Sequence, residues 1–171
     1  MTKLVPFALS GIIVVACLSS CSGGQSNTTQ SEAEIRDLLA RWEKGFLARD
    51  IDAVMSVYAP GDAVVAYDVG PPLQYKGKEA YRKSYEAFFA AYEGPLELEM
   101  RDARVVVSGD VAFIHSLEHI SGTLKGGQKS AVWLRETSGL RKLEGKWFLV
   151  HDHLSAPVDF EKTSALLDLT P

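Results

Sequence analysis

The sequence is poor in cysteine, and both of its cysteines lie near the N-terminus. Only Cys17 and Cys21 occur among 171 residues, so no disulfide can link two segments that follow residue 21. The chain also offers no helical His-x-x-x-His pair as a partner for its other histidines, which gives a metal site little support. The stability of the folded part must therefore come from packing, and we predict that no metal or cofactor is required.

Positive charge is scarce as well. The 18 Lys and Arg residues are scattered and are outnumbered by 22 Asp and Glu residues, which gives a formal charge of −4. Phosphate binding requires concentrated positive charge, so nucleic acid is excluded as a partner. With 46% hydrophobic residues, a chain of this length can form the core of one domain.

A long apolar run occurs only at the start of the chain. Residues 4–18 follow Lys3 and are too few for a comfortable transmembrane helix, but they are typical of a secretory signal. The sequence Leu18-Ser19-Ser20-Cys21 then resembles the bacterial lipobox, in which the cysteine is lipidated and becomes the first mature residue. We predict a signal peptide over residues 1–20. The lipid would hold the protein in the cell envelope, on the periplasmic or extracellular side of a bacterial membrane; the alternative is a secreted protein with a chance cysteine.

Three amphipathic helices are predicted in the first half of the chain. Residues 21–31 are mostly small and polar and are interpreted as a flexible tether. Ser31 and Glu34 match a capping box that predicts the start of the first helix. Asp50 can cap a second, shorter helix, and a third follows Gly77. The apolar stripe of the third helix is aromatic and is interpreted mainly as core packing: Tyr81, Tyr85, Phe88, Phe89 and Tyr92.

Strands dominate the second half. A short strand over residues 63–67 ends at Asp68, because the prolines that follow cannot continue it. From Leu96 the apolar residues alternate, and turns at residues 108–110, 126–127 and 144–145 separate four strands. The order α-α-β-α-β-β-β-β predicts an α+β cone, in which a curved antiparallel sheet carries three helices on its concave side.

These features resemble a known superfamily. The element order, a first helix with an aromatic residue at Trp42, the segment YDVGPPLQYKGKEAYR and the ending WLRETSGLRKLEGKWFLVHDHLSAP are similar to the nuclear transport factor 2-like superfamily. The resemblance is to its SnoaL-like, ketosteroid isomerase-related branch, over residues 32–160, and it implies a folded domain over residues 32–171. Because this fold hosts isomerases, cyclases, dehydratases, hydrolases and binding proteins, it does not by itself select a function. Ketosteroid isomerases use an Asp base with a Tyr and a protonated acid, and no motif here carries those residues over.

The turn at Glu144-Gly145 decides which residues face the last strand. A two-residue type I′ turn would force Glu144 to positive φ, whereas a three-residue loop with a bulge asks this only of glycine. We therefore predict the bulged loop, in which Lys142 pairs with Lys146.

This register brings two histidines onto a common face with residues of the preceding strand. It places Thr137 opposite His151 and Arg135 opposite His153. The alternative register would place Glu136 opposite His153 instead. A shift of one residue replaces every residue that lies opposite the last strand.

The Gly126-Gly127 turn is predicted to be type I′, which pairs Glu118 with Arg135. A carboxylate opposite Arg135 would neutralise the buried cation and leave donors for a ligand. The alternative is an ion pair with a purely structural role. Asp68, partly desolvated by Tyr67 and the prolines, is interpreted either as a general base or as a turn residue that bonds its own backbone.

Together these arguments predict a pocket for a small, partly apolar ligand that bears a carboxylate, an enolate or a carbonyl group. The histidines are interpreted as ligand-binding or acid/base groups, with structural and metal-binding roles as alternatives. A first alternative function is a cofactor-independent isomerase, cyclase or hydrolase acting on a carbonyl compound or ester, with Asp68 or His151 as the base. A second is a dimeric protein-interaction module. The predicted ligand-binding residues are Tyr67, Glu118, Trp133, Arg135, Thr137, His151 and His153.

A homodimer is also expected. Phe148, Val150 and Leu154 would share the opposite face of the last strand, where apolar side chains need a cover, and an identical subunit is the simplest one.

The lipobox gives the first testable prediction. Mass spectrometry of the mature protein should find an acylated N-terminal Cys21, because the signal peptidase of lipoproteins cleaves before the modified cysteine. A Cys21→Ser variant should leave the membrane fraction. An unmodified N-terminus at any other residue would contradict the prediction.

Overall fold

A computed structural model describes residues 23–171. The predicted signal peptide and Cys21 lie outside the described residues. Three α-helices and one 3-10 turn are present: α1 (Gly23–Ala48), α2 (Ile51–Ser56), η1 (Gly61–Ala63) and α3 (Lys78–Ala91). None of the helices in residues 23–171 combines the length and the apolar character that crossing a membrane requires.

The first helix begins earlier than predicted. It starts at Gly23 rather than at Ser31, so the predicted tether is helical from residue 23 onward. Ser31 is buried inside the helix, and the Glu34 carboxylate accepts hydrogen bonds from Gln30 Nε2 at 3.0 Å and Lys142 Nζ at 2.8 Å. The predicted capping box is wrong because Glu34 reaches forward to the sheet and not back to the backbone of Ser31.

The other two helix starts are confirmed. Asp50 caps α2, since its Oδ1 accepts from the backbone N–H groups of Asp52 at 3.1 Å and Ala53 at 3.0 Å. Helix α3 follows Gly77, whose φ of 84° favours glycine. The helix ends at Ala91, and the chain passes directly into a strand.

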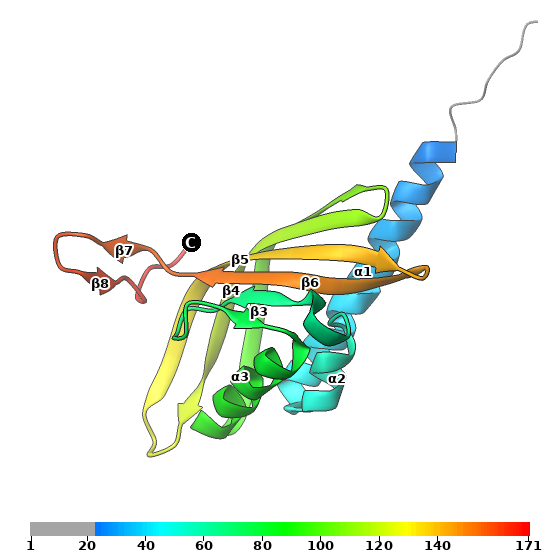
Figure 1. Cartoon of the computed structure of the whole chain (residues 1–171). Helices are drawn as coiled ribbons and strands as arrows, with labels where there is room; N and C mark the ends of the chain where they lie inside the picture. Colours follow the sequence, from blue (N-terminus) through cyan, green and yellow to red (C-terminus); the bar gives the residue numbers. More distant parts are fainter. Residues whose placement is uncertain (1–22) are drawn as a thin grey trace, which may run out of the picture.

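The main sheet has six strands in the order β2-β1-β6-β5-β4-β3. Strands β3 to β6 form the predicted antiparallel meander, but β1 runs parallel to β6, so the sheet is mixed rather than wholly antiparallel. A separate hairpin of two short strands follows and projects from the body (Figure 1). The strands are β1 (Val65–Tyr67), β2 (Tyr75–Lys76), β3 (Tyr92–Ser108), β4 (Val111–Leu124), β5 (Lys129–Leu143), β6 (Lys146–Ser155), β7 (Val158–Asp159) and β8 (Ser164–Ala165).

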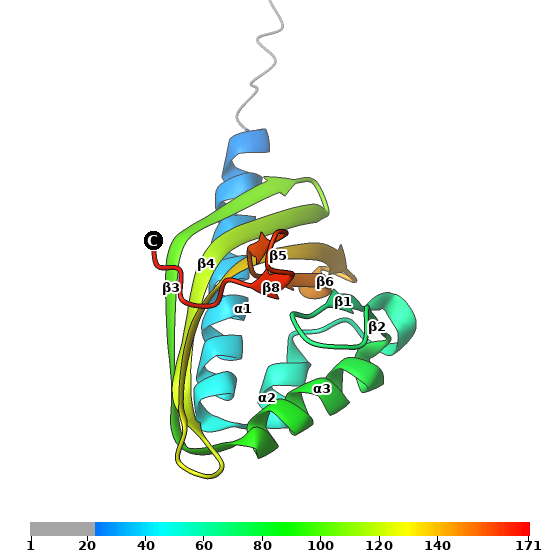
Figure 2. The same ribbon diagram turned by 90° about the vertical axis from the view of Figure 1, so that its left-hand side faces the viewer.

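The predicted α+β cone is confirmed. Figure 2 shows the long strands curving around α1, with α3 on the other side of the opening. We call the face of the sheet that packs on the helices the inner face, and the opposite one the outer face. The core between helices and sheet is rich in aromatic side chains, which bury large apolar areas and dominate core energetics. Its buried aromatic residues are Trp42, Phe46, Tyr58, Tyr81, Tyr85, Phe89 and Trp147.

The β5–β6 turn is shorter than predicted. Leu143 pairs with Lys146, so the loop is the two-residue one, and both Glu144 (φ 48°) and Gly145 (φ 79°) have positive φ. A left-handed conformation costs a side-chain-bearing residue about 1–2 kcal/mol. The prediction of a bulged loop was wrong because the pairing of the two long strands outweighs this local cost.

A β-bulge in β6 then changes which side chains face the helices. Leu140 pairs with Leu149 and Gly139 with His151, so Val150 is an extra residue. On the side of β6 away from β5, the hydrogen-bond partner changes at the bulge. Before it, Leu149 bonds the backbone of residues 57–59; after it, His151 is the first residue that pairs with β1. The inner face therefore passes from Leu149 to Asp152.

The preferred register for the last hairpin is wrong, and the alternative one holds only from the turn to the pair of Leu140 and Leu149; beyond the bulge neither applies. His153 lies opposite Thr137, while Arg135 lies opposite Ser155, beyond it. His151 lies opposite Gly139. Without the bulge, the two histidines would continue the inner face that Leu149 occupies.

The predicted pair of Glu118 and Arg135 is not formed. The β4–β5 loop spans three residues, with Leu124 N–H donating to the carbonyl of Gln128 at 2.8 Å, and Glu118 pairs with Leu134. Glu118 is on the inner face and is buried, whereas Arg135 is exposed on the outer face. The loop that contains Gly126 and Gly127 is therefore one residue longer than the predicted type I′ turn.

The apolar set expected to form a dimer interface is divided between the faces. Leu154 lines the inner cavity described below, while Phe148 and Val150 are only partly buried, against the edge of the core. The same bulge is responsible, because it moves Leu154 to the inner face. The three side chains thus do not form a common outer patch.

The strained turn gives a stability prediction. Replacing Glu144 by Asn should raise the free energy of unfolding by about 1 kcal/mol, because asparagine tolerates the left-handed conformation that a type I′ turn requires. Denaturant unfolding measures the difference. Glu161→Asn, at an exposed turn position with negative φ, should change nothing; an unchanged or lower stability for Glu144→Asn would contradict the interpretation.

Candidate functional site

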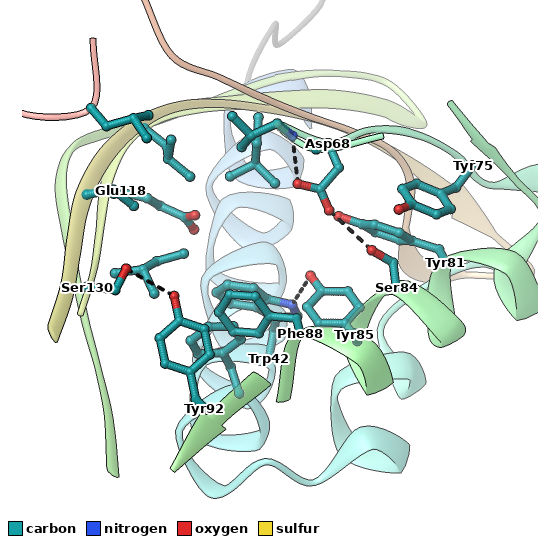
Figure 3. A pocket seen from close by; sticks show the side chains of 18 residues that line it. Trp42, Asp68, Tyr75, Tyr81, Ser84, Tyr85, Phe88, Tyr92, Glu118 and Ser130 are labelled. Carbon is teal, nitrogen blue, oxygen red and sulfur yellow. Dashed lines mark hydrogen bonds between the residues drawn. The ribbon is translucent and has the colours of Figure 1, made fainter. Parts of the chain in front are cut away.

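A cavity of about 410 Å³ lies between the inner face of the sheet and helices α1 and α3 (Figure 3). Its floor is aromatic, and its walls come from strands β4, β5 and β6. The loop after β1 and the segment after β8 border it. The lining residues are Trp42, Phe46, Asp68, Val69, Gly70, Tyr75, Tyr81, Ser84, Tyr85, Phe88, Tyr92, Glu118, Ile120, Ser130, Val132, Leu134, Leu154 and Leu167.

The polar groups that line the cavity are mainly carboxyl and hydroxyl groups. Among the described residues, none of the lining side chains is Lys, Arg or His. Its two carboxyl groups are Asp68 and Glu118, which point into the cavity from opposite sides (Figure 3). Such a surface suits an apolar molecule that accepts hydrogen bonds.

Asp68 lies where β1 ends, at one side of the cavity. Its Oδ1 accepts a hydrogen bond from the backbone N–H of Val69 at 2.7 Å, and its Oδ2 accepts one from the hydroxyl of Ser84 at 3.3 Å. The residue is partly exposed. Both interpretations of Asp68 thus have support, because it bonds its own turn and also faces the cavity.

Glu118 has the opposite environment. Its side chain is aimed into the cavity from the middle of β4, and the residue is only 2% exposed. No side chain or backbone group in residues 23–171 forms a hydrogen bond with its carboxyl group. Burial raises its pKa well above the ordinary value, and the charges of Glu136 and Asp152 add to the effect. Burial therefore favours the neutral carboxyl form of Glu118, which can donate a hydrogen bond.

A hydrogen-bonded network of buried side chains lies below this cavity. Tyr58 donates to Asp152 Oδ2 at 2.5 Å, and its oxygen lies 2.9 Å from the hydroxyl of Tyr85. The indole N–H of Trp42 donates to the same Tyr85 oxygen at 3.2 Å. On the other side, the Ser138 hydroxyl lies 2.6 Å from Asp152 Oδ1. The network joins all three layers: α1, α3 with the end of α2, and the sheet.

The acid at the centre of the network also has a raised pKa. Burial is the largest cause, and the nearby carboxyl of Glu136 is the second, so the pKa of Asp152 rises to about 7; hydrogen bonds from Ser138 and Tyr58 oppose the rise. Burial likewise raises the pKa of Tyr58 and Tyr85 well above their ordinary values. Both tyrosines therefore remain protonated and keep a hydrogen to donate.

Most of the predicted site residues lie on the outer face, away from the cavity. Of the predicted set, only Asp68 and Glu118 line the cavity. Trp133, Arg135 and Thr137 alternate with the inward side chains of β5, and the Trp133 ring stacks on His119 with ring centroids 4.9 Å apart. The placement follows from the strand registers, which put these residues on the face opposite Glu118.

The predicted histidines form a second outer group with Tyr67. The Tyr67 ring packs edge-on against His151 at 5.0 Å and His153 at 5.6 Å, and His151 Nδ1 lies 2.8 Å from the carbonyl oxygen of Val65. Within residues 23–171, no group of three or more His, Cys, Asp or Glu side chains is arranged to hold a metal ion.

Sequence reasoning missed Asp152 and its tyrosine partners. Simple alternation along β6 puts Asp152 on the face opposite the two histidines, which was taken as the outer one. A bulge cannot be recognised from Val150 alone. The aromatic stripe of α3 was identified, but only the fold reveals that Tyr85 and Phe88 line a cavity.

The family of the chain follows from comparison with known proteins. A model of the SnoaL-like domain matches residues 35–159. The chain therefore belongs to the SnoaL-like family, whose fold is the nuclear transport factor 2-like cone, and the predicted family is confirmed. No protein with a curated function matches the chain significantly.

Solved structures share this fold. A nuclear transport factor 2-like protein of unknown function from Pseudomonas putida KT2440 is 36% identical, with a TM-score of 0.77 over 84% of this chain and 99% of that one. A ketosteroid isomerase-like protein from Erwinia carotovora atroseptica is 26% identical, with a TM-score of 0.61 over 72% and 93%. A putative dehydratase of the same superfamily from Streptomyces avermitilis is 19% identical, with a TM-score of 0.66 over 77% and 99%, and shows likeness of fold alone.

The buried acids predict how stability depends on pH. The pKa of Asp152 is about 7 in the folded chain against an ordinary 3.8, so the folded state binds more protons than the unfolded state between these values. The stabilisation that comes from the protonated Asp152 is complete below pH 3.8 and is lost as the pH rises through 7. Unfolding free energy should therefore fall over this interval, and Asp152→Asn should flatten part of the fall.

Denaturant unfolding across this pH range measures the slope. Asp37→Asn, at an exposed position of α1, should keep the wild-type slope. A stability that rises with pH over the interval, or a slope that Asp152→Asn leaves unchanged, would contradict the assignment.

Proposed function

We propose that this domain binds a small, largely apolar molecule that carries a carbonyl group. The observation that supports this most directly is the Glu118 carboxyl group, which is buried, unpartnered among the described residues and aimed into an apolar cavity. A buried polar group without a partner costs free energy, and a ligand that accepts its hydrogen bond removes that cost. The cavity of about 410 Å³ is in the size range of small-molecule sites.

The chemistry of the lining narrows the ligand. The expected preference for a carboxylate depended on Arg135, which lies on the outer face, and no basic side chain among the described residues lines the cavity. A carboxylate would instead meet Asp68. A neutral carbonyl oxygen accepts from Glu118 without adding charge, while Trp42, Phe46 and Phe88 supply the aromatic floor.

Cofactor-independent acid/base catalysis is the second candidate, and the opposed pair of carboxyl groups favours it. Asp68, hydrogen-bonded and partly exposed, is the candidate base, whereas burial favours the neutral form of Glu118. A substrate between them could lose a proton next to its carbonyl group to Asp68, while Glu118 donates a hydrogen bond to the enolate oxygen that forms. The atoms balance without a cofactor, because the proton returns to the substrate at another position in an isomerisation.

We also propose that the domain is anchored in the cell envelope through a lipid on Cys21. The support is the lipobox, since Cys21 lies outside the described residues. Helix α1 begins at Gly23, so the lipid would join the helix after a very short connection.

The binding proposal is tested by titrating the full chain with prodan, a fluorescent naphthyl ketone, and with naphthalene, which has no carbonyl group. Glu118→Leu should weaken prodan binding by about 2- to 10-fold, the worth of one hydrogen bond, and leave naphthalene binding unchanged. Glu118→Gln retains a donor and should bind prodan nearly as wild type does. Prodan binding that Glu118→Leu leaves intact would refute the role of this residue.

The catalytic candidate is separated from simple binding by Asp68→Asn. This variant should bind prodan as wild type does, because the amide keeps the size of the carboxylate. It should stop exchange of deuterium into the carbon next to the carbonyl of a bound ketone. If wild type shows no such exchange above the rate in buffer, the domain binds its ligand without acting on it.

A further inference from the structure

The carboxyl groups of Asp152, which is buried, and Glu136, which is partly buried, share one serine hydroxyl beneath the cavity. Ser138 Oγ lies 2.6 Å from Glu136 Oε1 and 2.6 Å from Asp152 Oδ1. A serine hydroxyl has one hydrogen, so it can donate to only one of the two. Distances this short require a hydrogen in each contact. A proton on one of the two carboxyl groups would supply the second hydrogen, donated to Ser138 Oγ.

No cation relieves the charge of this pair. None of the ion pairs among the described residues involves Glu136 or Asp152. The groups that face Asp152 are Glu136 of β5, Glu118 of β4 and three buried tyrosines, Tyr58, Tyr81 and Tyr85. The ammonium group of Lys78 donates to the backbone carbonyl of Tyr58 at 3.2 Å and forms no ion pair with either carboxyl group. Two charged carboxylates in such surroundings are strongly disfavoured.

The pair is connected to the cavity by two hydroxyl groups. Tyr58 bonds Asp152 Oδ2 on one side and Tyr85 on the other, and Tyr85 lines the cavity (Figure 3). The indole N–H of Trp42 can only donate, so the Tyr85 oxygen accepts from it. The hydrogen of Tyr85 then has two choices, the oxygen of Tyr58 or an acceptor in the cavity.

We propose that the protonation of the Glu136–Ser138–Asp152 group sets the direction of the Tyr58 and Tyr85 hydroxyls, and so decides whether Tyr85 donates a hydrogen bond to a ligand. With one proton on the pair, Asp152 Oδ2 accepts from Tyr58, Tyr58 accepts from Tyr85, and no hydrogen points to the cavity. A second proton on Oδ2 reverses both hydroxyls. Donation then runs in one direction, from Glu136 through Ser138, Asp152 and Tyr58 to Tyr85.

Asp152 is thus a positioning residue that acts through two tyrosines. Adding a proton to it makes Tyr85 a second donor in the cavity beside Glu118. The two carboxyl groups titrate as a coupled pair. The raised pKa of Asp152, about 7, reflects in part the charge of Glu136, so it belongs to the first proton of the pair, and the second proton binds at a lower pH. A carbonyl ligand should bind more tightly below this pH than above it. The ligand part of the proposal rests on the proposed function, whereas the shared proton does not.

The shared proton is tested on the full chain without any ligand. Infrared difference spectra recorded on either side of pH 7 should contain the carbonyl stretch of a protonated carboxyl group that disappears as the pH rises. Asp152→Asn should remove this band, and Asp37→Asn should retain it. A wild-type spectrum without such a band, or a band that Asp152→Asn leaves in place, would overturn the acid pair.

The relay is tested by prodan titrations over the pH range below 7. Wild type should lose about 2- to 10-fold in affinity as the pH rises and the second proton leaves, because one hydrogen bond is withdrawn, and the emission of the bound ketone should shift to the blue. Asp152→Asn should bind tightly at every pH, since its amide always donates to Tyr58. Tyr85→Phe should bind weakly at every pH.

Tyr58→Phe is the decisive variant, because it cuts the relay and leaves the acid pair. It should keep the infrared band and lose the pH dependence of binding. A pH dependence that survives in Tyr58→Phe, or none in wild type, would refute the relay. If prodan binds to none of these proteins, the proposed binding function is wrong and the relay that serves it falls too, while the infrared titration still decides the acid pair.

Discussion

The buried carboxyl group of Asp152 is the constraint on which the rest of the structure depends. It lies in the core without a cation and is stabilised by the hydroxyls of Tyr58 and Ser138. Through Tyr58 it reaches Tyr85 and Trp42, so one network joins α1, α3 and the segment after α2 to the sheet. An unsatisfied charge at this position would cost several kcal/mol. The helices must therefore keep their present positions, and these positions leave the cavity open above the network.

One extra residue in β6 determines which side chains reach that network. The bulge at Val150 turns Asp152 and Leu154 to the inner face and His151 and His153 to the outer one. β-Bulges re-aim side chains in this way at many functional sites. The cavity consequently has carboxyl groups and hydroxyls as its polar groups, and this chemistry favours a neutral carbonyl ligand over an anion.

The two carboxyl groups of the cavity lie in different environments. Asp68 is partly exposed and accepts two hydrogen bonds, whereas Glu118 is buried and has no partner among the described residues. The two carboxyl groups can therefore take different roles, Asp68 as a base and Glu118 as a hydrogen-bond donor. A cone of this family can serve either binding or catalysis with such a pair, and deuterium exchange distinguishes the two.

The sequence by itself determined the element order, the α+β cone, the family, the Asp50 cap, the aromatic stripe of α3, and Asp68 as a residue near a cavity. These follow from local patterns, because capping, periodicity and turn residues act over a few positions. The tertiary structure alone decided the faces of β4, β5 and β6. Strand register reverses with each inserted residue, and the loop at Gly126-Gly127, the turn at Glu144-Gly145 and the bulge at Val150 were settled by the pairing of whole strands. Arg135, His151 and His153 were therefore assigned to the cavity, and Asp152 was missed, because no local pattern encodes a contact between strands.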